Sequence, residues 1–202
     1  PIRAAADSIS WFAETLHGLH LDRIFLVGMS FGGWLALTYT VAAPKRVQKL
    51  VLLSPGGLLP IAKQFSLRGM LMVWFPTRVM VNWFMRWLGI TGTDTRPVRE
   101  LTYLGLRHFR VPVETLRVMP VLFPEDRLRA MSVPTLLLIG GNEVICDPAM
   151  ALVRARRLFP DVQGELVPES SHEMCFSQRR IVDARVLDFL KKARTDDRGA
   201  IT

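Results

Sequence analysis

Apolar residues along this chain fall into short continuous runs that alternate with segments of helical period. Four of the runs have the length and composition of buried strands. The expected strands cover residues 24–27, 47–54, 133–139 and 163–167. The expected helices cover residues 5–16, 31–43, 147–159 and 178–192. Strands that alternate with helices predict a mostly parallel sheet of about four strands, flanked by helices, which is the α/β class.

The pattern changes between the second and third expected strands. No convincing strand is found there, and tryptophan, methionine and arginine become frequent. The region is expected to form a helical lid over residues 58–130, inserted into an α/β core made of residues 1–57 and 131–202. A stripe at helical spacing either packs on the core or lines an apolar substrate pocket, and the sequence leaves both interpretations open. The stripe consists of Met80, Trp83, Phe84, Trp87 and Leu88.

Composition limits the classes of function. The chain has 202 residues, of which 50% are hydrophobic, so it is long enough to bury a core and is not globally disordered. The net charge of +8 would be compatible with binding to nucleic acid, because basic surfaces attract phosphate. However, the basic residues are scattered, and the tight group at Arg154, Arg156 and Arg157 falls on an expected amphipathic helix. We therefore expect no nucleic-acid partner.

The first expected strand ends in a Gly-x-Ser-x-Gly motif formed by Gly28, Ser30 and Gly32. Such a motif can arise by chance, with glycines that only let a helix pack on a strand. Here a buried strand precedes it and a helix follows it, and this context is typical of a nucleophile elbow. In such an elbow the serine lies on a strained turn that projects its hydroxyl above the sheet.

Serine needs a general base, and the base needs an orienting carboxylate. His172 lies in a polar loop between the fourth strand and the last helix, which is the place expected for the base. The loop after the third strand offers Glu143 and Asp147 as the acid. Asp147 precedes Pro148 and is expected to cap a helix, whereas Glu143 is nearer the carboxyl end of the strand. Glu143 is therefore the preferred acid.

Together, the elbow, the acid loop running on to Asp147-Pro148 and the Ser-Ser-His loop resemble the α/β-hydrolase fold superfamily. Within it, they resemble the cap-bearing esterases and related hydrolases. The resemblance implies an α/β-hydrolase fold with a helical lid, and a serine hydrolase that forms an acyl-enzyme on Ser30. His172 would be the base and Glu143 its partner, with the backbone N–H of Phe31 in the oxyanion hole. It implies no cofactor and no metal.

The aromatic-rich lid favours a small apolar ester or acyl substrate. The competing interpretation is a non-catalytic binding protein that keeps the triad by ancestry. Contact with a membrane surface through the Trp-rich basic lid is compatible with either and has weaker support. Cys146 and Cys175 form no disulfide or metal pattern, and no signal peptide is recognised, so a cytoplasmic protein is expected. The oligomeric state does not follow from the sequence.

One departure from the family concerns the first strands. In this superfamily, several strands and a loop with a second oxyanion donor precede the helix that leads into the elbow. This chain begins at that helix, so we expect the C-terminal two-thirds of a hydrolase, either truncated or degenerate. Loss of one oxyanion donor can cost about 10²–10³ in rate. The elbow strand is then expected to form an apolar sheet edge.

Overall fold

Four parallel strands form the sheet at the centre of the protein. The computed structural model describes residues 5–92, 94–109 and 120–192. The strands are β1 (Ile24–Met29), β2 (Val47–Leu53), β3 (Thr135–Gly140) and β4 (Val162–Val167), and they lie side by side in that order. All three strand pairs are parallel. The predicted fold class is confirmed, and each strand begins within two residues of its expected position.

The helices of the α/β part follow the predicted order with one addition near the end, and further helices lie between β2 and β3, where a helical lid was expected. Those of the α/β part are α1 (Ala5–Gly18), α2 (Ser30–Ala42), α7 (Pro148–Leu158), α8 (Met174–Ser177) and α9 (Arg179–Lys191). Those between β2 and β3 are α3 (Lys63–Trp74), α4 (Arg78–Trp87), α5 (Arg96–His108) and α6 (Glu125–Arg129). The short helix α8 was not predicted, because four residues are too few to show a helical period.

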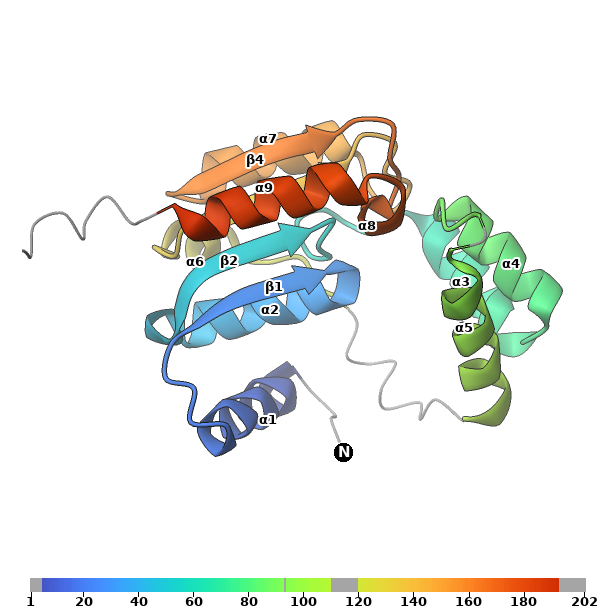
Figure 1. Cartoon of the computed structure of the whole chain (residues 1–202), viewed down its shortest axis with the longest axis horizontal. Coiled ribbons are helices and arrows are strands. Elements are labelled where there is room, and N and C mark those ends of the chain that lie inside the picture. Colours follow the sequence, from blue (N-terminus) through green and yellow to red (C-terminus); the bar gives the residue numbers. More distant parts are fainter. Residues whose placement is uncertain (1–4, 93, 110–119, 193–202) are drawn as a thin grey trace, which may run out of the picture.

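Helices cover opposite faces of the sheet (Figure 1), and alternate side chains of β2 pack against the two sets of helices. On β2, Leu50 and Leu52 belong to the cluster that includes residues of α2 and α7. The intervening Val51 and Leu53 belong to a second cluster with residues of α9. Because both faces of the central strands β2 and β3 are covered, their apolar runs at residues 50–53 and 136–139 are continuous, and such runs are visible in the sequence.

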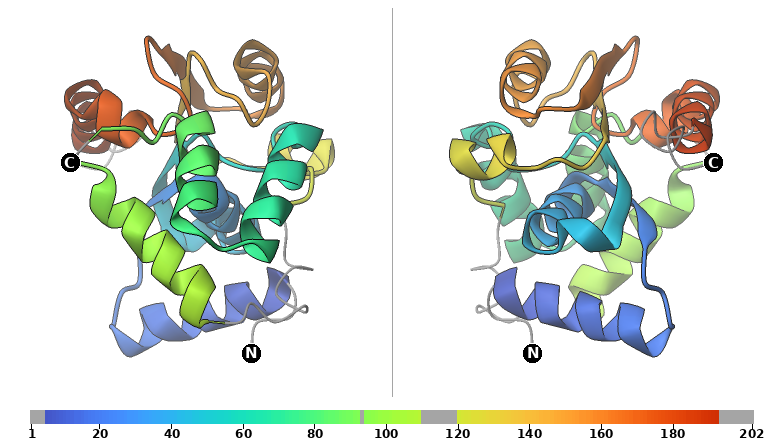
Figure 2. Two further views of the ribbon diagram at one scale, coloured as in Figure 1. Left: turned by 90° about the vertical axis from the view of Figure 1, so that its right-hand side faces the viewer. Right: turned by 90° about the vertical axis from the view of Figure 1, so that its left-hand side faces the viewer.

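Helices α3, α4 and α5, which we call the cap helices, lie beyond one end of the sheet (Figures 1 and 2). They enclose a hydrophobic cluster of their own, formed by Met72, Val81, Phe84, Met85, Leu88 and Ile90. Helix α6 packs on α7 instead, and its Leu128 is fully buried in the main core.

Four of the five predicted stripe residues pack in the cluster of the cap helices: Phe84 and Leu88 are buried, and Met80 and Trp87 are partly buried. Trp83 is the exception, because it is 40% exposed. The Arg68 guanidinium lies 4.3 Å from the centre of the Trp83 ring. A cation over its face gives this ring a partner outside the core, so a large aromatic residue does not have to lie on the buried side.

A buried lysine joins β2 to the last helix. Lys49 is 6% exposed, and its Nζ donates hydrogen bonds to the carbonyl oxygens of Phe189 at 2.7 Å and Leu190 at 3.0 Å. Lys192 supplies a third carbonyl acceptor. The last carbonyls of a helix have no intrahelical partner and carry partial negative charge. The ammonium therefore caps α9 and fixes its C-terminal end against the sheet.

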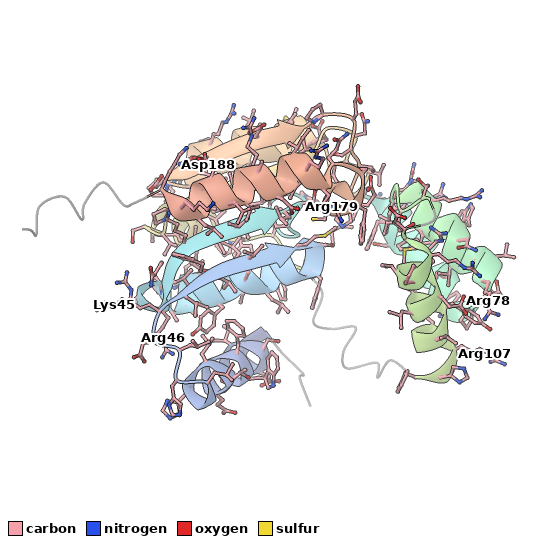
Figure 3. The ribbon with its side chains drawn as sticks, in the orientation of Figure 1. Lys45, Arg46, Arg78, Arg107, Arg179 and Asp188 are labelled. Atoms are coloured by element: carbon pink, nitrogen blue, oxygen red, sulfur yellow. The ribbon has the colours of Figure 1, made fainter. Side chains whose placement is uncertain are left out.

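Charged side chains are distributed over separate parts of the surface. Figure 3 shows Lys45 and Arg46 beyond one end of the sheet, while Arg78 and Arg107 project from the cap helices at the other end. Within the described ranges, no helix is both long enough and apolar enough to cross a membrane.

Candidate active site

Three loops meet at the carboxyl ends of the parallel strands. Ser30 follows β1, Glu143 lies three residues after β3, and His172 lies in the loop that follows β4. Loops at this end of a parallel sheet come together although they are far apart in the sequence. The structure thus brings the three predicted side chains into one site.

The backbone at the β1–α2 turn is strained. Ser30 has φ of +53°, in the left-handed region that side chains rarely adopt, and it is the first residue of α2. A Cβ on Gly28 would lie 2.4 Å from the carbonyl oxygen of Gly32, so glycine is required there. A Cβ on Gly32 would meet none of the described atoms within 4 Å. A side chain is therefore excluded by close approach at Gly28 and not at Gly32.

Two hydrogen bonds connect the three side chains. The distance between Ser30 Oγ and His172 Nε2 is 2.8 Å, and the distance between His172 Nδ1 and Glu143 Oε2 is also 2.8 Å. The side chains of His172 and Glu143 are 7% and 2% exposed. With Nδ1 donating to the carboxylate, Nε2 is free to accept the Ser30 proton, which is the tautomer that general-base catalysis needs.

The second carboxylate oxygen of Glu143 is held by the backbone of its own loop. Oε1 accepts the N–H groups of Val144 at 2.9 Å and Ile145 at 3.0 Å. Burial by itself would raise the pKa of Glu143. The hydrogen bond and charge of His172, the Ile145 N–H and the Ser54 hydroxyl outweigh burial and hold this pKa below its ordinary value of 4.5. Glu143 is therefore ionised at neutral pH.

The other candidate acid, Asp147, has a different environment. Its carboxylate accepts the backbone N–H of Met150 at 2.9 Å and caps the N-terminus of α7. Asp147 is exposed, whereas Glu143 is the carboxylate that contacts His172. Proline at the first position of α7 marked this capping role in the sequence.

Ser54 is a site residue that the sequence analysis missed. It follows β2, is 6% exposed and has φ of +41°. Its hydroxyl accepts the backbone N–H of Gly140 at 3.4 Å and donates to Glu143. The available signal was a serine at the carboxyl end of a buried strand, but only the pairing of β2 with β3 shows that it reaches the acid loop.

The backbone N–H of Phe31 lies in the first turn of α2, next to Ser30. The first N–H groups of a helix have no intrahelical acceptor, and the helix dipole adds partial positive charge there. Phe31 also lines the cavity into which Ser30 opens. This N–H is therefore available to an oxyanion that forms on a substrate attached to Ser30.

The cavity beside Ser30 has a volume of about 590 Å³, including its open mouth, and its surface is mostly apolar. Its polar lining comes from Ser30, Ser54, Glu143 and His172. Among the described residues, neither Trp83 nor Trp87 lines it, and the cap helices contribute Phe65 instead. The principal apolar side chains around it are Phe31, Leu58, Ile61, Phe65, Ile139 and Ile145.

The cavity also contains a thiol. Burial, together with the nearby charges of Glu143 and Asp147, raises the pKa of Cys146 to about 12, so it stays protonated and is a poor nucleophile at neutral pH. In the part of the chain that the structure describes, no group of three or more His, Cys, Asp or Glu side chains has the arrangement of a metal site.

Comparison with known proteins gives a family match and several curated relatives, among them two carboxylesterases. The family model described as serine aminopeptidase, S33 (Hydrolase_4) matches residues 4–179. The uncharacterized carboxylesterase nap of Bacillus subtilis (strain 168) is 27% identical over 185 residues, covering 91% of this chain and 62% of that protein. Carboxylesterase YbfK of the same organism is 25% identical over 198 residues, covering 92% of this chain and 63% of that protein.

A solved structure extends the similarity to three dimensions. Naproxen esterase (carboxylesterase NP) from Bacillus subtilis matches with a TM-score of 0.82 at 26% identity, over 92% of this chain and 66% of that chain. This chain therefore spans somewhat less than two thirds of the length of these relatives.

The lowered pKa of Glu143 predicts a specific dependence of stability on pH. Because this pKa is below 4.5 in the folded chain, the stabilisation by the ionised carboxylate is complete above pH 4.5 and is lost as the pH falls through the folded value. In urea unfolding between pH 4.5 and about pH 3, we expect a shallower slope of unfolding free energy against pH in Glu143→Gln than in the wild type, by up to about 1.4 kcal/mol per pH unit. Equal slopes would contradict the assigned direction.

Proposed function

The chain belongs to the serine aminopeptidase, S33 family of the α/β-hydrolase superfamily, and from this premise we propose that it carries the catalytic centre of a serine hydrolase that cleaves carboxylic esters. The observation that supports this most directly is the continuous hydrogen-bonded chain from Ser30 through His172 to Glu143, which opens into an apolar cavity. The carboxylesterase relatives support the same class of reaction.

In the proposed reaction, Ser30 Oγ attacks the ester carbonyl carbon while His172 Nε2 takes its proton. The carbonyl oxygen becomes an oxyanion that accepts the Phe31 N–H. Collapse of this intermediate breaks the bond to the alcohol oxygen, which receives the proton from His172, and leaves an acyl group on Ser30. Water then attacks the acyl-enzyme with His172 again as base, which releases the carboxylic acid and restores Ser30.

Glu143 holds the His172 ring in orientation and stabilises the imidazolium that forms at each proton transfer. It remains ionised throughout, so glutamate can fill this role as well as aspartate.

The cavity favours a neutral, apolar acyl group. Its lining is almost wholly apolar, and Glu143 is the one carboxylate among the described lining residues. Because Glu143 already pairs with His172, it is not available to bind the ammonium group of a peptide N-terminus. The lining therefore favours a simple ester over an aminopeptidase substrate.

A fluorophosphonate probe tests whether Ser30 is a nucleophile. The folded chain is expected to be labelled at Ser30, with loss of fluoride from phosphorus, and Ser30→Ala is expected to lose the label, as read by mass spectrometry of the modified peptide. If the folded chain is not labelled, this chain is not a serine hydrolase and the non-catalytic binding interpretation is favoured.

The acid can be tested by ranking two carboxylate replacements. Glu143→Gln is expected to lower kcat for p-nitrophenyl butyrate by about 10²–10⁴-fold, because His172 loses its charged partner. Asp147→Asn keeps an oxygen that can cap α7 and is expected to stay within about threefold of the wild type. The opposite ranking would reject Glu143 as the acid.

Acyl-chain preference tests whether the cavity binds the acyl group. Phe65→Ala enlarges the cavity and is expected to raise the ratio of kcat/KM for p-nitrophenyl octanoate to that for the butyrate by about tenfold. Trp83→Ala removes an aromatic residue from α4 that does not line the cavity and is expected to leave this ratio within about twofold. An equal effect of both changes would show that the cavity does not select the acyl chain.

A further inference from the structure

The acid loop belongs both to the candidate triad and to the cluster of the cap helices. The side chains of Val144 and Ile145 pack against that cluster, which is formed by residues of α3 and α4 together with Ile90. The backbone N–H groups of the same two residues donate to Glu143 Oε1. The two residues that follow Glu143 in the chain therefore connect the hydrophobic packing of the cap helices to the carboxylate that holds His172.

A backbone hydrogen bond strengthens this connection. The carbonyl oxygen of Ile145 accepts the N–H of Ala62 at 2.8 Å, and Ala62 directly precedes α3. Ile145 thus contacts α3 through its carbonyl, Glu143 through its N–H and the cavity through its side chain. A displacement of α3 has to move Ile145 or break this bond.

The end of α4 has a geometry that requires glycine. The N–H of Ile90 donates to the carbonyl of Met85, and the N–H of Gly89 donates to the carbonyl of Arg86. These two bonds form a Schellman motif, in which the residue after the C-cap is left-handed. Gly89 has φ of +86°, as this motif demands.

The same glycine lies against the loop that carries His172. A Cβ on Gly89 would be 2.8 Å from Ser171 Cβ and 3.0 Å from Glu173 Cγ. Ser171 and Glu173 are the two neighbours of His172 in the chain, and the Glu173 carboxylate caps α8 by accepting the N–H of Ser177. The turn after α4 is therefore in contact with both residues that flank His172 in the chain.

The acid loop and the histidine loop are also bonded to each other. Ser171 Oγ donates to the carbonyl of Asn142 at 3.0 Å, and the N–H of Asn142 donates to the carbonyl of Ser170 at 2.8 Å. The cap helices thus contact a unit of two loops, at Ile145 on one loop and at the neighbours of His172 on the other.

We propose that the cap helices hold the Glu143–His172 pair in its reactive geometry, with Gly89 and Ile145 as positioning residues. The inference rests on the proposed function, and it extends that function by linking the walls of the cavity to the alignment of the base. Phe65 and Ile145 line the cavity and also pack with the cap cluster, so an acyl chain seated against them presses on the residue whose N–H holds Glu143. A misplacement of about 1 Å in such a pair can lower a rate by about 10²-fold.

Gly89→Ala and Gly92→Ala form a matched pair for the test. Both glycines have φ of +86°, so alanine introduces the same backbone strain at each. At Gly89 the methyl group collides with Ser171, whereas at Gly92 it meets none of the described atoms within 4 Å. The rate of fluorophosphonate labelling of Ser30 is expected to fall about tenfold or more in Gly89→Ala, and to stay within about twofold in Gly92→Ala. For p-nitrophenyl butyrate, the loss is expected in kcat with little change in KM.

The proton between His172 Nδ1 and Glu143 gives a readout that needs no activity. Its far-downfield ¹H NMR signal is expected in the wild type and in Gly92→Ala, and is expected to shift or disappear in Gly89→Ala. If the wild type shows this signal but is not labelled by the fluorophosphonate, the proposed function is contradicted. The signal in Gly89→Ala then still tests whether the cap helices position the Glu143–His172 pair. If Gly89→Ala keeps the wild-type signal, or the wild type lacks it, the proposal is wrong.

A second pair covers the case in which Gly89→Ala does not fold. Ile145→Val removes one methyl group between the cap cluster and the acid loop. Ile181→Val is the control, because Ile181 is also half-buried but packs in the α9 cluster. The labelling rate is expected to fall about threefold in Ile145→Val, with a shifted downfield signal, and to change little in Ile181→Val. Equal behaviour of the two variants would overturn the role of Ile145.

Discussion

A buried carboxylate must be surrounded by donors, and this requirement organises the carboxyl end of the sheet. The Glu143 side chain is 2% exposed, and an ionised group so far removed from water is tolerated only when its oxygens are hydrogen-bonded. Its donors come from its own loop, from the histidine loop and from the end of β2. Three segments far apart in the sequence have to converge before the charge is satisfied. The alignment of His172 with Ser30 follows from that convergence.

A buried positive charge lies toward the opposite end of the sheet, and it also needs hydrogen-bond partners. Lys49 is buried near the start of β2, and its ammonium is satisfied by carbonyl groups at the end of α9. Main-chain groups supply all three carbonyl partners of the ammonium and two of the four partners of the carboxylate, the others being the side chains of His172 and Ser54. Main-chain partners are fixed by the fold, so the geometry of each buried charge depends on the packing of whole elements.

The features that could be predicted from the sequence are those that depend on neighbours along the chain. Strands buried on both faces leave apolar runs, and Pro148 indicated that Asp147 caps a helix and left Glu143 as the preferred acid. The features that escaped prediction depend on neighbours in space. Trp83 faces outward because Arg68 of another helix covers its ring. An added Cβ at Gly32 would meet none of the described atoms within 4 Å, and Ser54 reaches Glu143 only because β2 pairs with β3. Nothing near Gly89 in the sequence indicates that it contacts the histidine loop.

The contacts of Lys49 have a consequence for how the chain is made. Lys49 and its first acceptor, Phe189, are 140 residues apart, and Ser30 and His172 are separated by 142. At about 5–20 residues per second, translation needs roughly 7–28 s to pass from one member of each pair to the other. During that time the ammonium of Lys49 must stay hydrated or be bound by a chaperone, because its helix does not yet exist. Until His172 has been made, the nascent polypeptide therefore carries Ser30 without its hydrogen-bond partner, and the bonded chain from Ser30 to Glu143 forms only afterwards.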